Sequence, residues 1–322
     1  MGGVETGVLV VLVVVVVVVV IGSPGDGLAT RILGRWAPRL DPTPERVATV
    51  RRHLVRQRRL FVILAVLVVV GPTIYVWSGA VGTYQQDSVT YQVLNVLGRL
   101  SWYPLLLCMI IAIAVAELAA ALDRPRSALR AASLRPRRTT DVVPRYGLAL
   151  LGALVCVQLA AAAVALTRLR NPGLPAATYP ESLQVRTLDV QQAPVVVWAG
   201  VIALAVATLL VVTVLRLVTT RRAALDERHD DGLDVALRGR SARMTLGLGL
   251  MAVGMLPSTA FEGLRAAANY ADGAYSGSFW ADSAGFVGLV CMLAGFLGWV
   301  FVANPPWPGF RAVAATAAGR DR

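Results

Sequence analysis

The chain has 322 residues, of which 56% are hydrophobic and 16% are charged, against a charged fraction of about 25% in soluble domains. Its formal net charge is +12, and all 31 basic residues are arginine because the sequence contains no lysine. This composition argues against an ordinary soluble domain, and the long apolar blocks argue against a disordered basic tail.

Seven apolar segments follow one another along the chain, each close to the length of about 20 helical residues that crosses a bilayer. In water the run of valines at Val13 to Val20 would favour a strand, but in lipid the backbone must satisfy its own hydrogen bonds, so helix is expected. The sequence therefore predicts an all-α, polytopic membrane bundle of about seven transmembrane helices in a single domain, 1–322. The predicted spans are 4–21, 60–77, 102–122, 146–166, 193–218, 244–260 and 284–303.

The first segment, 4–21, is interpreted as an uncleaved membrane anchor rather than as a signal peptide. A signal peptide carries a positive region ahead of its apolar core and a small-residue cleavage site behind it. Here the leading residues contain Glu5 and no arginine, and the sequence from Gly22 to Gly25 is a poor cleavage site. The arginines follow the apolar run instead, which favours an anchor whose N-terminus lies outside the cell.

The arginines lie mainly in alternate loops, at 22–59, 123–145 and 219–243, and in the C-terminal tail, with Arg216 at the end of the fifth segment. The remaining arginines are Arg99, Arg168, Arg170, Arg186 and Arg265. Because positive residues stay on the cytoplasmic side, this pattern predicts an N-terminus outside and a cytoplasmic C-terminus. Abundant Ala, Val, Gly and Arg without lysine is typical of a GC-rich bacterial genome, so the expected location is the bacterial inner (plasma) membrane.

Two charged residues lie inside predicted spans. Glu117 is about six positions from the cytoplasmic end of the third span, and Arg216 lies at a similar depth in the fifth. A charge at mid-membrane costs at least about 2.5–3.5 kcal/mol, which makes both residues functional candidates. Either they form an ion pair that joins two helices, or each reaches separately towards the cytoplasmic headgroups, as arginine readily does.

A proton relay through Glu117 is less favoured, because no second acidic or histidine partner is visible within the spans. Both histidines, His53 and His229, fall in predicted loops. Among uncharged polar residues, Gln158 and Thr208 could line a polar path through the bundle. Interhelical hydrogen bonds, worth about 0.6 kcal/mol each on average, are the favoured role for both.

Small residues form a stripe on the seventh predicted span. Gly288, Cys291, Gly295 and Gly298 fall within about 80° of one another on a helical wheel at 100° per residue. Such a stripe lets a neighbouring helix approach closely. The sixth span offers a counterpart in Gly247, Gly249 and Gly254, so a tight hairpin of the sixth and seventh spans is expected.

No catalytic constellation is found: the chain contains no HExxH motif and no Walker A motif. We therefore expect a protein that is not an enzyme and needs no cofactor or metal. The favoured interpretation is a non-catalytic membrane component, namely a regulator, sensor or partner subunit. The alternative is a small-molecule permease or the membrane subunit of a transporter.

The expected partners are membrane lipid and a protein that meets the cytoplasmic loops. The arginines from Arg51 to Arg59 are placed to touch anionic lipid, each contributing about 1 kcal/mol near the surface. Nucleic acid is not expected, because membrane topology already accounts for the positive charge.

Overall fold

The computed structural model describes residues 25–38, 40–70, 103–122, 142–169, 193–220, 227–256, 260–261 and 279–304. Over these residues the chain is helical and contains no strand, which confirms the predicted all-α class. The helical elements are α2 (Asp26–Trp36), α3 (Pro44–Ala65), the π-helical turn η1 (Val66–Val70), α6 (Tyr103–Leu122), α8 (Arg145–Leu169), α9 (Ala193–Thr220), α10 (Glu227–Met255) and α12 (Phe279–Ala303).

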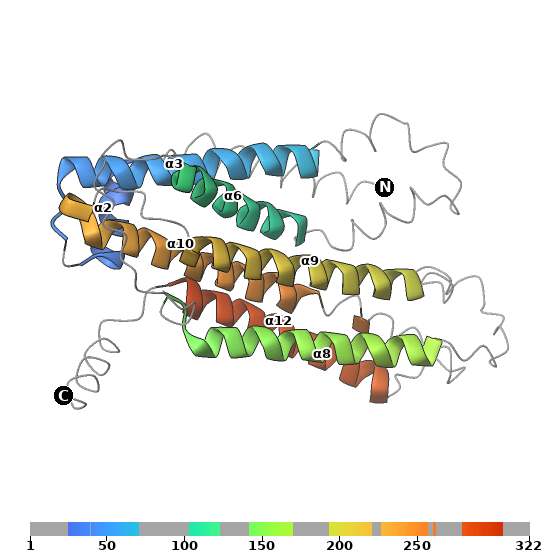
Figure 1. Ribbon diagram of the computed structural model, residues 1–322. Helices are drawn as coiled ribbons and strands as arrows, with labels where there is room; N and C mark the ends of the chain where they lie inside the picture. Colours follow the sequence, from blue (N-terminus) through green and yellow to red (C-terminus); the bar gives the residue numbers. More distant parts are fainter. Residues whose placement is uncertain are drawn as a thin grey trace, which may run out of the picture.

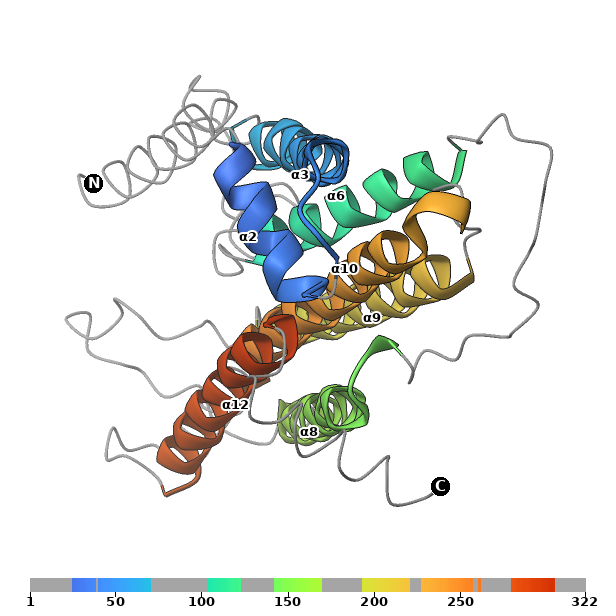
Figure 2. The ribbon, with the colours of Figure 1, turned by 90° about the vertical axis from the view of Figure 1, so that its left-hand side faces the viewer.

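The helices lie in layers with α10 at the centre (Figure 1). α3 and α6 lie on one side, α9 and α10 lie in the middle, and α8 and α12 lie on the other side; Figure 2 shows the same order from one end. Accordingly, α10 contacts α2, α6, α8, α9 and α12. Because α10 packs against five other helices, it is the central element of the described part of the molecule.

Four of the helices are long and apolar enough to cross a membrane. The qualifying stretches are Tyr103–Ala120, Arg145–Thr167, Pro194–Thr220 and Gly285–Ala303. Only 28% to 44% of each stretch is buried inside the molecule, so large apolar side chains such as Leu209 and Phe286 point outwards. Lipid is the solvent in which such a surface is stable, and these helices correspond to predicted spans 102–122, 146–166, 193–218 and 284–303.

The other three predicted spans have different outcomes. Segment 4–21 lies outside the described residues, and segment 60–77 is described only to residue 70, where α3 and η1 enter it as one continuous run. Residues 244–255 of segment 244–260 form the second half of α10, which already begins at Glu227, and residues 257–259 lie outside the described residues. Seven α-helices are present among the described residues, but one of them, α2, lies inside the predicted loop 22–59.

Local sequence signals explain why α3 begins inside loop 22–59. The Thr43 side chain caps α3 by accepting from the Arg46 backbone N–H, and Pro44 occupies the first turn, where its missing N–H costs nothing. α2, α3 and α10 then meet through pairs of apolar residues spaced four apart, which lie on one helix face. These buried pairs are Ala29 and Leu33, Val50 and Leu54, and Leu233 and Leu237.

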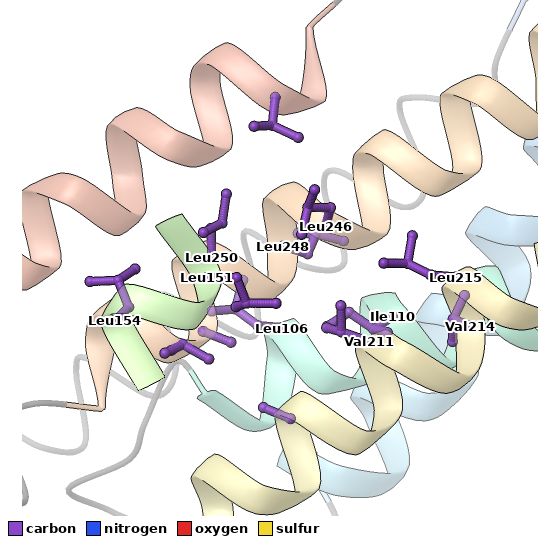
Figure 3. Close-up of a cluster of buried hydrophobic side chains, with 14 of the residues drawn as sticks. Leu106, Ile110, Leu151, Leu154, Val211, Val214, Leu215, Leu246, Leu248 and Leu250 are labelled. Carbon is purple, nitrogen blue, oxygen red and sulfur yellow. The ribbon is translucent and has the colours of Figure 1, made fainter. Parts of the chain in front are cut away.

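The larger core lies between α6, α8, α9 and α10 (Figure 3). Ile110 from α6 and Val211 from α9 point towards each other, and Leu246 and Leu250 of α10 lie close to Leu151 of α8. Between membrane helices this packing stabilises through close van der Waals contact, because lipid tails are as apolar as the side chains.

Arginines of α8, α9 and α10, among them Arg145, Arg216 and Arg243, gather at one end of the bundle, which we call the arginine-bearing end. α8 and α10 begin there, and α9 and α12 end there (Figure 1). Contacts agree with this arrangement, because Gly147 at the start of α8 lies against Leu246 of α10 and Val302 at the end of α12. The predicted loop 219–243 is wrong over most of its length, because α10 begins at Glu227, and residues 123–141 of the predicted loop 123–145 lie outside the described residues.

Candidate functional site

A polar cluster is buried where α3, α6 and α10 meet, at the arginine-bearing end of the bundle. It consists of His53, Gln57, Glu117, Arg240 and Ser241. Glu117, near the end of α6, has a relative exposure of 0%, and Ser241 is equally buried. A buried carboxylate is costly unless hydrogen bonds and opposite charge compensate it, so the neighbours of Glu117 determine whether this arrangement is stable.

A chain of hydrogen bonds runs through the polar cluster from a cation to an anion. The Arg240 guanidinium donates to Gln57 Oε1 over 3.1 Å. The Gln57 amide donates to Ser241 Oγ over 3.4 Å, and the Ser241 hydroxyl donates to Glu117 Oε1 over 2.6 Å. Every donor is directed towards the carboxylate, so each bond polarises the next in the same sense. Positive Arg240 is thereby linked to negative Glu117 through two neutral side chains.

His53 lies beside this chain, with its Nε2 3.0 Å from Gln57 Nε2 and 3.6 Å from Glu117 Oε1. Because the Gln57 oxygen faces Arg240, the Gln57 amide nitrogen is directed to His53. In this arrangement an unprotonated His53 Nε2 can accept from the Gln57 amide. The separation from Glu117 is too long for a good hydrogen bond, but it allows electrostatic attraction when the ring carries a proton.

Opposite charges partly compensate one another in and near the polar cluster. Burial lowers the pKa of the Arg240 guanidinium, and the negative charge of Glu117 partly offsets that effect. Further towards the start of α10, Asp234 Oδ2 lies 2.6 Å from Arg238 Nε in a buried ion pair between residues four apart. Both residues of this pair belong to α10, so the pair compensates charge within that helix, and losing one member is more costly than losing an exposed charge.

The backbone brings the cluster together through helices that extend beyond the predicted spans. His53 and Gln57 are four residues apart on α3, so they share one face of that helix. Arg240 and Ser241 lie midway along α10, before the predicted start of the sixth span. α3 lies next to α6 (Figure 2), and the Gln57 side chain of α3 reaches Arg240 and Ser241 of α10, which places these residues around Glu117.

Glu117 has a histidine neighbour that comes from outside the predicted spans. His53 falls in the predicted loop 22–59, but the structure places it on α3, within 3.6 Å of the carboxylate. The reason is that α3 begins at Pro44 and runs alongside α6 instead of starting at residue 60. The signal that could have located it is the capping sequence at Thr43 and Pro44, which marks a helix start well before the apolar segment.

The predicted partner of Glu117 lies elsewhere on the molecule's surface. Arg216 is exposed on α9, and its backbone carbonyl accepts hydrogen bonds from Thr219 and Thr220 one turn later. The contacts described for Glu117 are with Ser241 and His53. The ion pair between Glu117 and Arg216 therefore stays a prediction.

Gln158 and Thr208, the candidates for a polar lining, use their polar groups within the protein. The Gln158 amide is buried and donates to the Val253 carbonyl over 3.1 Å, which joins α8 to α10. The Thr208 hydroxyl donates to the Leu204 carbonyl one turn earlier on α9. A cavity of about 10 Å³ lies beside Gln158, which is at the lower limit for a single water molecule.

The small-residue stripe on α12 lies at close helix contacts. A Cβ added to Gly295 would be 2.6 Å from the Leu250 carbonyl oxygen and 2.8 Å from the Gly254 Cα. A Cβ on Gly254 would in turn meet the Cys291 carbonyl oxygen at 2.8 Å. These neighbours are backbone atoms that cannot rotate away, so α10 and α12 cross where both lack a side chain.

The remaining glycines of the predicted hairpin face different neighbours. Gly288 lies against the Phe261 ring, and Gly298 lies against Leu150 of α8 as well as Leu250 of α10. On α10, Gly247 faces the end of α12, but a Cβ on Gly249 would lie 2.5 Å from Val211 Cγ2 of α9. The glycines of α10 therefore serve two helix contacts instead of one.

The polar cluster can hold three helices in one register and can rearrange its hydrogen bonds when its charges change. In the described part of the chain, no group of three or more His, Cys, Asp or Glu side chains lies close enough to hold a metal ion. In comparisons with known proteins, the chain matches no family model, no curated protein and no solved structure.

Proposed function

We propose that the chain is a multi-pass protein of the bacterial inner (plasma) membrane, with about seven spans, an external N-terminus and a cytoplasmic C-terminus. Four membrane-length helices support the location. The gathering of arginine-bearing helix ends at one end of the bundle supports the orientation (Figure 1), because positive residues remain on the cytoplasmic side.

Labelling of single cysteines checks this orientation. With the native cysteines replaced by alanine, we expect a membrane-impermeant maleimide to label Ser182→Cys, in the predicted outer loop, on intact cells. Arg31→Cys, at an exposed position of α2, should be labelled only after the cells are permeabilised. The reverse pattern would show that the orientation is inverted, and labelling of both positions on intact cells would contradict the span count.

We further propose that the protein is a non-catalytic membrane component, acting as a regulator, sensor or partner subunit. One observation carries this proposal: the hydrogen-bond chain from Arg240 through Gln57 and Ser241 to Glu117. It connects α3, which packs against the arginine-rich α2, to the membrane helix α6 and to the central helix α10. A change at either end of the chain can shift helices in the other layer, because buried polar contacts have discrete arrangements.

The permease alternative has less support. A permease needs a polar path that reaches mid-membrane, and Gln158 and Thr208 were its candidate lining. Both side chains are engaged in hydrogen bonds within the bundle, and the cavity beside Gln158 has room for about one water molecule. These contacts favour helix packing over a transport path in this conformation.

Photo-crosslinking in cells tests the proposed function. A photoreactive amino acid at Leu28, which is 48% exposed on α2, should give one protein adduct, whose identity is read by mass spectrometry. The same group at Leu209, 67% exposed on the membrane helix α9, is the matched control and should give only lipid adducts. Gln57→Ala, which breaks the hydrogen-bond chain, should change the yield at Leu28 at least twofold at equal protein level.

Two results would contradict this proposal. Equal protein adducts at Leu28 and Leu209 would show that α2 offers no particular partner surface, and an unchanged yield in Gln57→Ala would show that the polar cluster does not couple to α2. Solute uptake by vesicles that contain the purified chain alone would favour the permease instead.

A further inference from the structure

A groove of about 940 Å³ opens between α3 and α6 at the arginine-bearing end of the bundle, and Asp234 and Leu237 of α10 contribute to its wall. This volume lies within the range of sites that hold small organic molecules, about 300–1,000 Å³. We refer to it as the arginine groove.

One wall of the arginine groove is strongly basic. Arg52, Arg56 and Arg59 all line it from α3, and their spacing of four and three residues places them on one helix face. Together they span about 10 Å at 1.5 Å per residue. The acidic residue in the lining, Asp234, is already paired with Arg238. The groove therefore presents a net positive surface that matches an anion.

The opposite part of the arginine groove is apolar. Leu60 of α3 and Val115 and Ala119 of α6 line it. The apolar surface continues along α3 beyond the groove, where Ile63 is 56% exposed and Leu67 of η1 is 65% exposed. A ligand that fits both parts must carry a negative head and an apolar body, in the order in which a lipid lies in a bilayer.

We propose that the arginine groove binds an anionic phospholipid, with the headgroup phosphate against Arg52, Arg56 and Arg59 and the acyl chains along α3 and α6. An acidic peptide would match the charge but leave the apolar track of Leu60, Val115 and Leu67 uncovered. His53 lines the groove and is also a member of the polar cluster. A phosphate bound in the groove would therefore lie next to that cluster. The effect of bound lipid on sensing rests on the proposed function, but lipid binding itself does not.

The test measures lipid binding by the full chain purified in a neutral detergent, with native mass spectrometry to count bound lipids. Phosphatidylglycerol is compared with phosphatidylcholine that has the same acyl chains. We expect one phosphatidylglycerol to bind well below the concentration at which phosphatidylcholine binds. Substituting R52Q, R56Q and R59Q together should weaken phosphatidylglycerol binding on the order of 100-fold, because each arginine near an anionic surface contributes about fivefold.

A charge-matched control separates the groove from general surface charge. R31Q, R145Q and R216Q together remove the same charge from exposed positions outside the groove and should change the affinity by less than about threefold. Ala119→Trp keeps every charge but fills the groove, and it should also abolish tight binding. Helix content from circular dichroism verifies that each variant folds; the three groove arginines are exposed, so their loss leaves the core intact.

Several outcomes would overturn the proposal. Equal losses in both triple variants would assign binding to surface charge, and equal binding of the two lipids would remove the anionic requirement. Binding of glycerol phosphate as tight as that of the lipid would indicate a soluble phosphate site, and equally tight binding of a polyglutamate peptide would indicate a peptide site. Because the purified chain is measured alone, failure here is distinguishable from failure of the crosslinking experiment on α2.

Discussion

Replacing Glu117 with alanine is expected to lower the free energy of unfolding by about 1–3 kcal/mol, the usual cost of leaving a buried hydrogen-bonding group without its partner. The carboxylate accepts from the Ser241 hydroxyl and offsets the effect of burial on the nearby Arg240 guanidinium. Its removal leaves the Ser241 hydroxyl buried without that acceptor and the Arg240 guanidinium without that compensating charge. Unfolding of the purified chain by sodium dodecyl sulfate in mixed micelles, followed by circular dichroism, measures the change.

The matched control is Glu45→Ala, which removes the same side chain from an exposed position in the first turn of α3. We expect it to change stability by no more than about 0.5 kcal/mol. If Glu117→Ala were as mild as this control, the polar cluster would not hold the helices together, and the function proposed for it would lose its basis.

Double-mutant cycles show which residues act with Glu117. Combining Glu117→Ala with Gln57→Ala should give a non-additive effect of at least about 0.5 kcal/mol, because both belong to one hydrogen-bond chain. Combining it with Arg216→Ala tests the ion pair predicted from the sequence. Simple additivity in that second cycle would remove the predicted pair and leave the polar cluster as the environment of Glu117.

Replacing Gly295 with alanine is expected to destabilise the protein by about 1–3 kcal/mol or more, the typical cost of overpacking a core. The added Cβ would meet the Leu250 carbonyl oxygen at 2.6 Å and the Gly254 Cα at 2.8 Å. Since these atoms belong to the backbone of α10, relief requires the two helices to move apart. The same unfolding measurement applies, and Gly254→Ala should behave alike because the contact is reciprocal.

Gly285→Ala on the same helix is the control for helix propensity. A Cβ there meets nothing within 4 Å, and alanine is favoured over glycine in a helix by about 0.8–1 kcal/mol in water. We therefore expect Gly285→Ala to be neutral or stabilising. A loss of stability in both variants would point to a general intolerance of α12, and a harmless Gly295→Ala would contradict the close crossing of α10 and α12.

Some of the candidate site was accessible from the sequence. Glu117 stands out because a carboxylate inside a long apolar segment is visible without any knowledge of neighbours, and Gly295 stands out because helical spacing places it on a small-residue face. Their partners could not be read in the same way. The meeting of His53 and Gln57 with Glu117 depends on how α3 lies against α6, and no local pattern specifies that.

Length and apolarity alone indicated the all-helical class and the four membrane-length helices among the seven predicted spans, because both are local properties of a segment that lipid converts directly into helix. The distribution of the 31 arginines between alternate loops predicts the orientation of the chain in the membrane. The structural role of residues 22–59 becomes visible only in the tertiary structure, in which α2 and α3 form a layer on α10 through Leu33, Leu54 and Leu237. It also brought Glu117 to Ser241 and opened the arginine groove, because contacts between distant segments depend on packing that no single segment encodes.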